Sequence, residues 1–323
     1  MSGPSNVLIT SAGRRTFLVQ AFKAALGAAG RVLAADLDPL APALQLADDA
    51  VRLPRLDDPA YGDNLVGLVG RSDVRAIIPT IDTELLTLLD VSDALRSRGA
   101  TAVVSERRLI ASTIDKWLTV KTFRAEEVTC PLTWLPQELD GASLPDRLVV
   151  KPRFGSASQG ILRVRKDQVA HAVALTENPI IQEELTGREV TVDALFDMTG
   201  RLIHYVPRLR LKAIGGESVE GVTISRNELG PWIDAALLAC GRLGACGPIT
   251  LQCFIDSGGA KLTEVNARFS GGFPLTYRAG GHYPQWLLEE LNGSSVRSRI
   301  GEYEVGLKMT RHYVEIFPAE TPW

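Results

Sequence analysis

The sequence is poor in the residues that build disulfide frameworks and metal clusters. Its 323 residues include only four histidines and four cysteines, Cys130, Cys240, Cys246 and Cys253. The cysteines form no Cys-x-x-Cys pair, so we interpret them as buried free thiols of a reducing compartment. No uncharged run approaches the ~18 apolar residues of a membrane span, and the first residues do not resemble a signal peptide. We therefore expect a soluble cytoplasmic protein.

A strong charge of either sign is also missing. The formal net charge is -3, which gives no reason to expect nucleic acid or a membrane surface as a partner. Local basic clusters remain able to hold phosphates. With 45% hydrophobic residues the chain can bury a large core, and its length suits two or three domains. We expect small-molecule partners, and the composition leaves a homodimer open.

The first hundred residues lack the glycine fingerprint of a dinucleotide site. Residues 7–10 and 32–35 are apolar strands around a helix at 17–26, and Asp36 follows where a Rossmann fold places its ribose acid. The first turn contains Gly13 alone. It continues with Arg14 and Arg15, where a pyrophosphate needs close approach to the backbone. Nicotinamide binding is thus disfavoured; Arg14 or Arg15 could hold a substrate anion, or could simply begin a solvated helix.

Two acids follow the next predicted strand, at residues 76–79. Asp82 and Glu84 would lie at the carboxyl edge of a parallel sheet, where ligands of α/β folds bind. They are candidates for a substrate ammonium group, and helix capping is the alternative. A strand at 101–104 is expected to close this sheet.

A small, polar hairpin follows the predicted strand at residues 148–152. The strand ends in Lys151, and residues 155–160 read Gly-Ser-Ala-Ser-Gln-Gly before a strand at 161–164. Backbone amides of such a hairpin can cover a polyphosphate while a lysine supplies charge, which makes it a candidate lid. No Gly-Lys-Ser/Thr precedes a helix, so it is not a P-loop. A plain turn is the alternative.

A row of functional side chains occupies the predicted hairpin at residues 249–268. In an extended strand Glu264, Asn266 and Arg268 lie on one face. If Asp256 pairs with Ala260, Gln252 lies opposite Glu264. These are oxygen ligands of the kind that Mg²⁺ accepts, beside a guanidinium for an anionic oxygen. An exposed polar sheet face is the alternative.

Three cations alternate on the predicted strand at residues 202–212. Arg208, Arg210 and Lys212 share one face, where like charges repel unless anions lie between them. The face therefore indicates phosphate or carboxylate binding. A surface strand that pairs with neighbouring acids such as Glu217 or Glu220 is the alternative. Residues 215–218, Gly-Gly-Glu-Ser, form a loop that we expect to approach the same place.

The order of these segments resembles the ATP-grasp superfamily across essentially the whole chain. The likeness is carried by Asp115-Lys116, by Val150-Lys151-Pro152 with its hairpin, by Gln182-Glu183-Glu184-Leu185 with Glu189, by Gln252, and by Glu264-x-Asn266-x-Arg268. It is greatest to small-molecule ligases similar to one half of the carbamoyl phosphate synthase large subunit, kin of biotin carboxylase and D-alanine ligases. The hairpin has fewer glycines than the family usually shows.

The resemblance implies an α/β fold with α+β grasp domains. A Rossmann-like parallel-sheet domain would span residues 1–112, a central lid 113–185, and an antiparallel-sheet domain with the metal site 186–323. ATP phosphates would meet Lys116, Lys151, Gly155, Ser156, Ser158 and Gly160. The adenine and ribose would meet Glu183, Glu184, Leu185 and Glu189. One or two Mg²⁺ ions, replaceable by Mn²⁺, would bind Gln252, Glu264 and Asn266.

The activity that the resemblance implies is an ATP-dependent, ADP-forming carboxylate:amine or carboxylate:thiol ligase. It would act through an acyl phosphate on small molecules, with amino acids as candidates. Arg268, Arg208 and Arg210 would serve catalysis. Substrate would meet Arg14, Asp82, Glu84, Gly216, Glu217, Ser270 and Gly271. The alternatives are a phosphotransferase that stops at a phosphorylated product, and a nucleotide-binding or regulatory protein without turnover.

Overall fold

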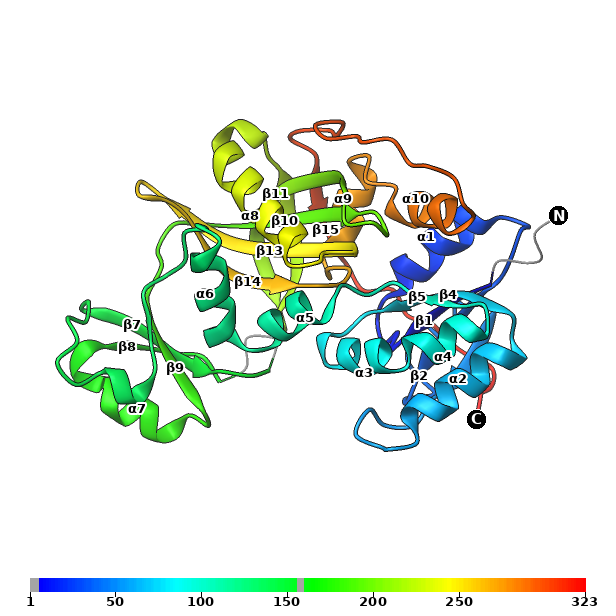
Figure 1. Cartoon of the computed structure of the whole chain (residues 1–323), viewed down its shortest axis with the longest axis horizontal. Helices are drawn as coiled ribbons and strands as arrows, with labels where there is room; N and C mark the ends of the chain where they lie inside the picture. The colour runs from blue at the N-terminus through cyan, green and yellow to red at the C-terminus, as the bar shows by residue number, and fades with distance from the viewer. Residues whose placement is uncertain (1–5, 156–159) are drawn as a thin grey trace.

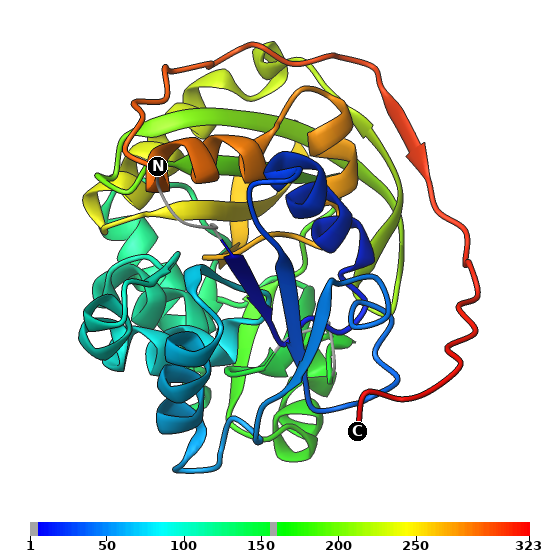
Figure 2. The same ribbon diagram turned by 90° about the vertical axis from the view of Figure 1, so that its right-hand side faces the viewer.

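The computed structural model describes residues 6–155 and 160–323, in which the strands form three sheets (Figures 1 and 2). A five-stranded parallel sheet has the order β3-β2-β1-β4-β5. A four-stranded antiparallel sheet has the order β6-β9-β7-β8, and a six-stranded antiparallel sheet has the order β14-β13-β10-β11-β12-β15. The predicted fold class, a parallel-sheet domain followed by antiparallel grasp sheets, is confirmed. None of the described helices is long and apolar enough to cross a membrane.

The parallel sheet is buried on both faces. Its strands are β1 (Asn6–Thr10), β2 (Val32–Asp36), β3 (Asp49–Arg52), β4 (Val74–Pro79) and β5 (Thr101–Ala102). Its helices are α1 (Thr16–Leu26), α2 (Tyr61–Arg71), α3 (Leu85–Asp90) and α4 (Ser92–Ser97). Val7, Leu8 and Ile9 are fully buried, as expected for a strand with helices on both sides. The last strand ends at Ala102, two residues before the predicted end.

The four-stranded sheet extends away from the rest of the chain (Figure 1). It consists of β6 (Thr133–Trp134), β7 (Arg147–Pro152), β8 (Leu162–Arg165) and β9 (Pro179–Glu183), with α7 (Val169–Leu175) on one face. Leu148, Val150 and Ile181 form a small core of their own with α7. A separate core leaves this sheet free to move as a unit.

Two helices connect the parallel sheet to this small domain. They are α5 (Arg107–Ile114) and α6 (Lys116–Ala125). The two helices are separated at Asp115, because its backbone is extended and its side chain caps α6. Its Oδ1 accepts hydrogen bonds from Trp117 N at 2.9 Å and Leu118 N at 3.2 Å.

The six-stranded sheet carries the predicted metal row. Its strands are β10 (Arg188–Phe196), β11 (Leu202–Ile214), β12 (Glu217–Thr223), β13 (Gly247–Asp256), β14 (Gly259–Asn266) and β15 (Lys308–Thr310). The helices are α8 (Gly230–Arg242), α9 (Phe273–Arg278) and α10 (Tyr283–Leu291). The strand β15 is short, because only Lys308–Thr310 pairs with β12. The four cysteines are free.

The β13–β14 hairpin contains a bulge that was not predicted. Asp256 pairs with Gly259, so the assumed pairing with Ala260 is wrong by one residue. The register shifts between Gln252 and Cys253, with Thr263 as the extra residue, and Gln252 then pairs with Glu264. The predicted pair thus forms because the one-residue bulge offsets the one-residue error in the assumed register at the turn.

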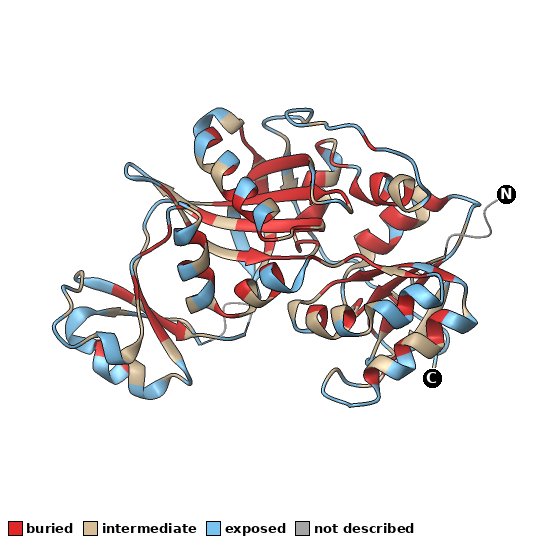
Figure 3. Ribbon diagram, viewed as in Figure 1, coloured by how far each residue is buried: buried red, intermediate tan, exposed pale blue. Residues whose placement is uncertain are grey.

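The parallel sheet and the C-terminal helices share one hydrophobic core. Val7, Ile9 and Phe22 pack in the same cluster as Tyr283 and Trp286. Figures 1 and 2 show α1 beside α10, and Figure 3 shows the buried residues continuing between them. These two parts therefore form a common block, whereas the β6-β9-β7-β8 sheet does not share its core.

Candidate functional site

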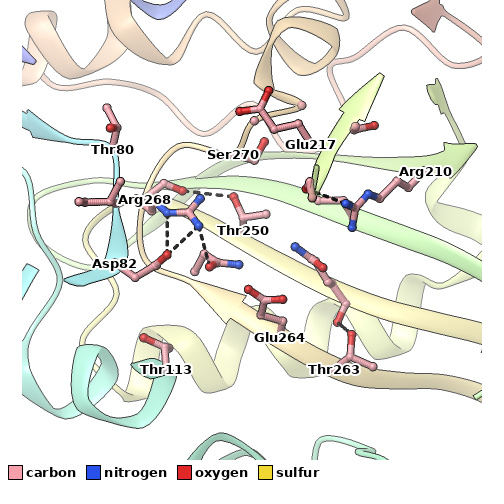
Figure 4. Close-up of a pocket in the computed structure, with 18 of the residues that line it drawn as sticks. Thr80, Asp82, Thr113, Arg210, Glu217, Thr250, Thr263, Glu264, Arg268 and Ser270 are labelled. Atoms are coloured by element: carbon pink, nitrogen blue, oxygen red, sulfur yellow. Dashed lines mark hydrogen bonds and ion pairs between the residues drawn. The ribbon is translucent and has the colours of Figure 1, made fainter. Parts of the chain in front are cut away.

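A cavity of about 300 Å³ lies where segments of the three sheets meet. Its wall includes Thr80 and Asp82 after β4, Lys116 on α6, and the polar faces of β11, β13 and β14 (Figure 4). Of the predicted site residues it brings together Arg14, Asp82, Lys116, Gly155, Arg208, Arg210, Gly216, Glu217, Gln252, Glu264, Asn266, Arg268, Ser270 and Gly271. The cavity is therefore our candidate active site.

Other predicted site residues do not line this cavity. They are Glu84, Lys151, Gly160, Glu183, Glu184, Leu185 and Glu189. Ser156 and Ser158 lie outside the described residues. The cavity thus corresponds to the predicted phosphate, metal and substrate positions, and not to the predicted adenine position.

Cations outnumber carboxylates around the cavity. The cationic lining residues are Arg14, Arg15, Lys116, Arg208, Arg210 and Arg268, six in all, against the three acids Asp82, Glu217 and Glu264. Two further acids, Asp193 and Glu189, pair with Arg208 and Arg210. Six cations against five carboxylates still leave positive charge, so the cavity suits an anionic ligand.

The oxygen row of the hairpin faces the cavity. Gln252, Glu264 and Asn266 all line it, and the bulge lets the neighbouring Thr263 line it too. Among the described residues no cluster of three His, Cys, Asp or Glu side chains could bind a metal. One carboxylate with two amide oxygens does fit Mg²⁺, which keeps several waters and binds largely through substrate phosphates.

Arg268 bridges the C-terminal sheet and the parallel-sheet domain. Its Nε and Nη2 donate to Asp82 Oδ2 at 2.8 and 2.7 Å, and Nη2 donates to Asn266 Oδ1 at 2.9 Å (Figure 4). Asp82 makes no side-chain cap, contrary to the alternative interpretation. Its Oδ1 is buried without a partner among the described residues. Asp82 therefore orients Arg268 in the wall of the cavity.

Glu84 lies inside the parallel-sheet domain. Its carboxylate is fully buried and accepts hydrogen bonds from Tyr61 OH at 2.5 Å and Ser11 Oγ at 3.0 Å. Burial raises the pKa of Glu84 above its ordinary value. This position suits a buried structural acid rather than a contact to a substrate ammonium group.

The arginine row on β11 is matched by carboxylates from β10. Arg208 Nε donates to Asp193 Oδ2 at 2.9 Å, and Arg210 Nη1 donates to Glu189 Oε1 at 2.7 Å. Arg210 Nη2 also donates to Gly216 O at 2.7 Å. Arg208 Nη1 and Arg210 Nε are buried and have no partner within the described part of the chain. Both guanidinium groups line the cavity with donors to spare.

Lys116 and Lys151 lie close enough to influence each other. Lys116 Nζ donates to Gly155 O at 2.6 Å. Burial and, to a smaller extent, the nearby charge of Lys116 together lower the pKa of Lys151 to about 8. Burial also lowers the pKa of Lys116. Two desolvated lysines side by side would be relieved by a bound polyanion.

The predicted adenine segment lies on the edge of the small domain. Glu183 Oε1 accepts hydrogen bonds from Lys261 Nζ at 2.7 Å and Leu132 N at 2.8 Å, so it connects β9 to β14. Glu184 forms an ion pair with Arg147. The Glu183 and Glu184 side chains are thus used in contacts within the protein. Only the backbone groups of this segment are left for contact with a base.

Two residues that pair with side chains of the cavity wall, but do not line the cavity themselves, escaped sequence reasoning. Asp193 lies at the centre of a buried polar network in which it accepts from Arg208, Thr250 and Thr276. The available signal was an acid among the apolar residues that end β10. Arg311 follows β15 and pairs with Glu217 at 3.5 Å. No local pattern marks it, since its position depends on the pairing of β15 with β12.

Comparison with protein families gives two matches. Residues 7–103 match the family described as PylC-like, N-terminal domain, and residues 176–312 match ATP-grasp in the biosynthetic pathway with Ter operon. No curated protein sequence matches the chain.

Solved structures resemble the chain over most of its length. The biotin carboxylase domain of 2-oxoglutarate carboxylase from Hydrogenobacter thermophilus, solved with MgADP and bicarbonate, has a TM-score of 0.76 at 15% identity, covering 95% of this chain and 74% of that one. The ADP complex of N5-carboxyaminoimidazole ribonucleotide synthetase has a TM-score of 0.72 at 15% identity, covering 92% of this chain and 79% of that one. An L-amino acid ligase from Bacillus licheniformis has a TM-score of 0.69 at 18% identity, covering 91% of this chain and 75% of that one. At these identities the likeness is one of fold.

Proposed function

Because the chain belongs to the ATP-grasp superfamily, we propose that it is an ATP-dependent ligase that activates a small carboxylic acid and joins it to an amine. One observation carries the proposal. The cavity gathers an arginine-rich wall and the oxygen donors Glu264, Gln252 and Asn266 at the junction of the three sheets. Such a wall suits phosphoryl transfer, which depends on positioning and charge neutralisation more than on a covalent nucleophile.

Each part of the wall has a role in this proposal. Glu264, Gln252 and Asn266 would hold Mg²⁺, which when bound would neutralise charge on the phosphate oxygens. Lys116 and Lys151 would meet the phosphates from the side of the small domain. The segment 183–185 would meet the adenine through its backbone, and Glu189 the ribose hydroxyls.

The chemistry has two steps. A carboxylate oxygen of the acid attacks the γ-phosphorus of ATP, and the bond from phosphorus to the ADP oxygen breaks, giving an acyl phosphate and ADP. The amine nitrogen then attacks the acyl carbon; a C–N bond forms, the C–O bond to phosphate breaks with its electron pair leaving on phosphate, and the nitrogen loses a proton to solvent or a base. Arg268, already held by Asp82 and Asn266, presents its charge without reorganisation.

An ADP-release screen with mass analysis of products tests the function. We expect ADP only when ATP, Mg²⁺, an acid and an amine are all present, together with a product that has the mass of acid plus amine minus water. Each reaction lacking either the acid or the amine is the control. ADP release with the acid alone and a stable phosphorylated product would indicate the phosphotransferase alternative. Nucleotide binding without release in any combination would indicate the regulatory one.

We also expect nucleotide affinity to fall above about pH 8. The pKa of Lys151 is lowered to about 8, so rising pH removes its proton and with it the charge that attracts phosphate. Loss of a single required proton weakens binding by up to about tenfold per pH unit. Titration calorimetry with ADP at pH 7 to 9.5 measures this.

Two variants make the pH experiment specific. Lys151→Gln should weaken binding at pH 7 and flatten the pH dependence. Lys166→Gln, at an exposed lysine of the same small domain, should leave the profile unchanged. An unaltered profile in Lys151→Gln would mean that Lys151 does not contact the nucleotide phosphates.

A further inference from the structure

A second cavity of about 300 Å³ opens beside the first. The two share five lining residues, Arg14, Arg15, Glu217, Ser270 and Gly271. The shared residues come from the start of α1, the start of β12 and the loop before α9. A molecule in the second cavity would therefore reach the candidate active site through this junction.

The far wall of the second cavity is apolar. Its apolar lining residues are Phe17, Leu18, Phe269, Phe273, Pro274 and Met309. Phe269 and Phe273 are each 2% exposed, and their ring centroids are 4.7 Å apart in an edge-to-face contact. Close-packed aromatic walls hold their shape, so the cavity is preformed. Its volume is at the low end for ligand pockets, and its apolar wall suits an apolar side chain rather than a phosphate group.

The junction between the cavities is charged. Glu217 lies 3.8 Å from Arg14, 3.6 Å from Arg15 and 3.5 Å from Arg311. These distances exceed the 2.7–2.9 Å typical of a charge-assisted hydrogen bond, so none of the three pairs is tight. Three guanidinium groups around one carboxylate leave positive charge unbalanced, which favours a second anion.

Burial of the arginine side chains further favours binding of a second anion. The pKa of Arg15 is lowered to about 10, first by burial and then by the nearby charge of Arg268. Burial likewise lowers the pKa of Arg311. A substrate carboxylate between Arg15 and Arg311 would offset both effects.

We propose that the second cavity binds the apolar side chain of the amine substrate, an α-amino acid. An α-carbon bears a carboxylate, an amino group and a side chain, and the junction offers a partner for each: Arg15 with Arg311, Glu217, and the apolar cavity. Arg311 does not line the main cavity, so the carboxylate held there is not the one that is activated. The amino group on Glu217 faces the main cavity, where the acyl phosphate would form. This inference rests on the proposed function.

Calorimetry on the full chain tests the proposal without knowledge of the acid. L-phenylalanine, L-leucine and L-methionine should bind at least tenfold more tightly than glycine or L-aspartate. Phenethylamine lacks the carboxylate and 3-phenylpropionate lacks the amino group, so both should bind at least tenfold more weakly than L-phenylalanine. Equal binding of glycine and L-phenylalanine, or no binding of any amino acid in the presence and absence of an ATP analogue, would overturn the proposal.

Three variants locate the binding. Met309→Trp, which fills the cavity, should weaken L-phenylalanine binding at least tenfold, and Met309→Ala, which enlarges it, should shift preference toward L-tryptophan. Arg311→Gln should weaken the binding of all α-amino acids and leave the binding of phenethylamine, which has no carboxylate, unchanged. Lys308→Gln, on the exposed side of β15, is the control. Unchanged amino-acid binding in both Met309 variants would overturn the proposal.

Nucleotide affinity separates this inference from the proposed function. All four variants should bind ADP within twofold of the parent protein, which also shows that they are folded. If nucleotide binds and ADP is released with an acid and an amine, but apolar amino acids show no preference, only the inference fails. If no nucleotide binds, the proposed function fails whatever the amino-acid result.

Discussion

Glu264→Gln should lower ATP turnover by about 10²–10³-fold or more, the range for loss of a group that stabilises transition-state charge. Of the three carboxylates that line the cavity, Asp82 pairs with Arg268 and Glu217 lies among arginines. Glu264 forms no hydrogen bond or ion pair with the described residues and acts only through its charge on Lys116 and Lys151, so it is the carboxylate left for a metal cation. Glutamine keeps its shape and removes the charge. ADP release measured against Mg²⁺ concentration should show both a lower maximum and a higher Mg²⁺ requirement.

The control for this experiment is Glu228→Gln. Glu228 pairs with Arg188 on the surface, away from the cavity, and the same loss of charge there should leave turnover unchanged. Thermal unfolding midpoints of the two variants should agree with that of the parent protein. Turnover within twofold of normal in Glu264→Gln, with an unaltered Mg²⁺ dependence, would remove Glu264 from the site.

Asp193→Ala should destabilise the protein by about 3–5 kcal/mol, the cost of removing one partner of a buried ion pair. Asp193 and Arg208 are each 2% exposed, and their closest N–O distance is 2.9 Å. The same carboxylate accepts from Thr276 Oγ1 at 2.5 Å and Thr250 Oγ1 at 3.2 Å. The change therefore leaves the buried guanidinium and the Thr276 hydroxyl without their acceptor, whereas the Thr250 hydroxyl keeps the backbone oxygen of Arg268. Urea unfolding, followed by circular dichroism, measures the loss.

Two further variants test whether the loss of stability comes from the unpaired charge of Arg208. The double variant Asp193→Ala/Arg208→Met should recover part of the lost stability. The second change removes the buried positive charge that Asp193→Ala leaves without a partner. Asp57→Ala, at a fully exposed pair with Arg55, should leave the unfolding midpoint unchanged. A midpoint for Asp193→Ala equal to that of the parent would show that Asp193 is not what balances the Arg208 charge.

The metal row shows what alternation can and cannot predict. A period of two along β14 and the two residues after it was enough to place Glu264, Asn266 and Arg268 on the cavity wall. The assumed register was one residue off at the turn, and the bulge at Thr263 restored the pairing of Gln252 with Glu264. A bulge depends on the local geometry of two paired strands, so no count along one strand reveals it.

The arginine row on β11 shows a different limit. Like charges on one face were correctly expected to need anions between them, but the chain supplies anions of its own. The register that pairs Val190 with Leu209 puts Glu189 beside Arg210. The order of strands in the sheet decides which strand lies next to β11. The sequence of β11 alone does not reveal that order. Asp82 was missed as the partner of Arg268 for the same reason, since 186 positions separate them.

During synthesis on the ribosome, the core shared by the parallel sheet and the C-terminal helices cannot form completely until the C-terminal helices have been synthesised. Phe22 packs in one cluster with Phe269, Tyr283 and Trp286, which are synthesised more than two hundred residues later. At 5–20 residues per second that interval is roughly 10–50 s. During it the face that β1 and α1 later bury against the C-terminal helices is covered only in part. This core is therefore complete only after Val296 has been synthesised.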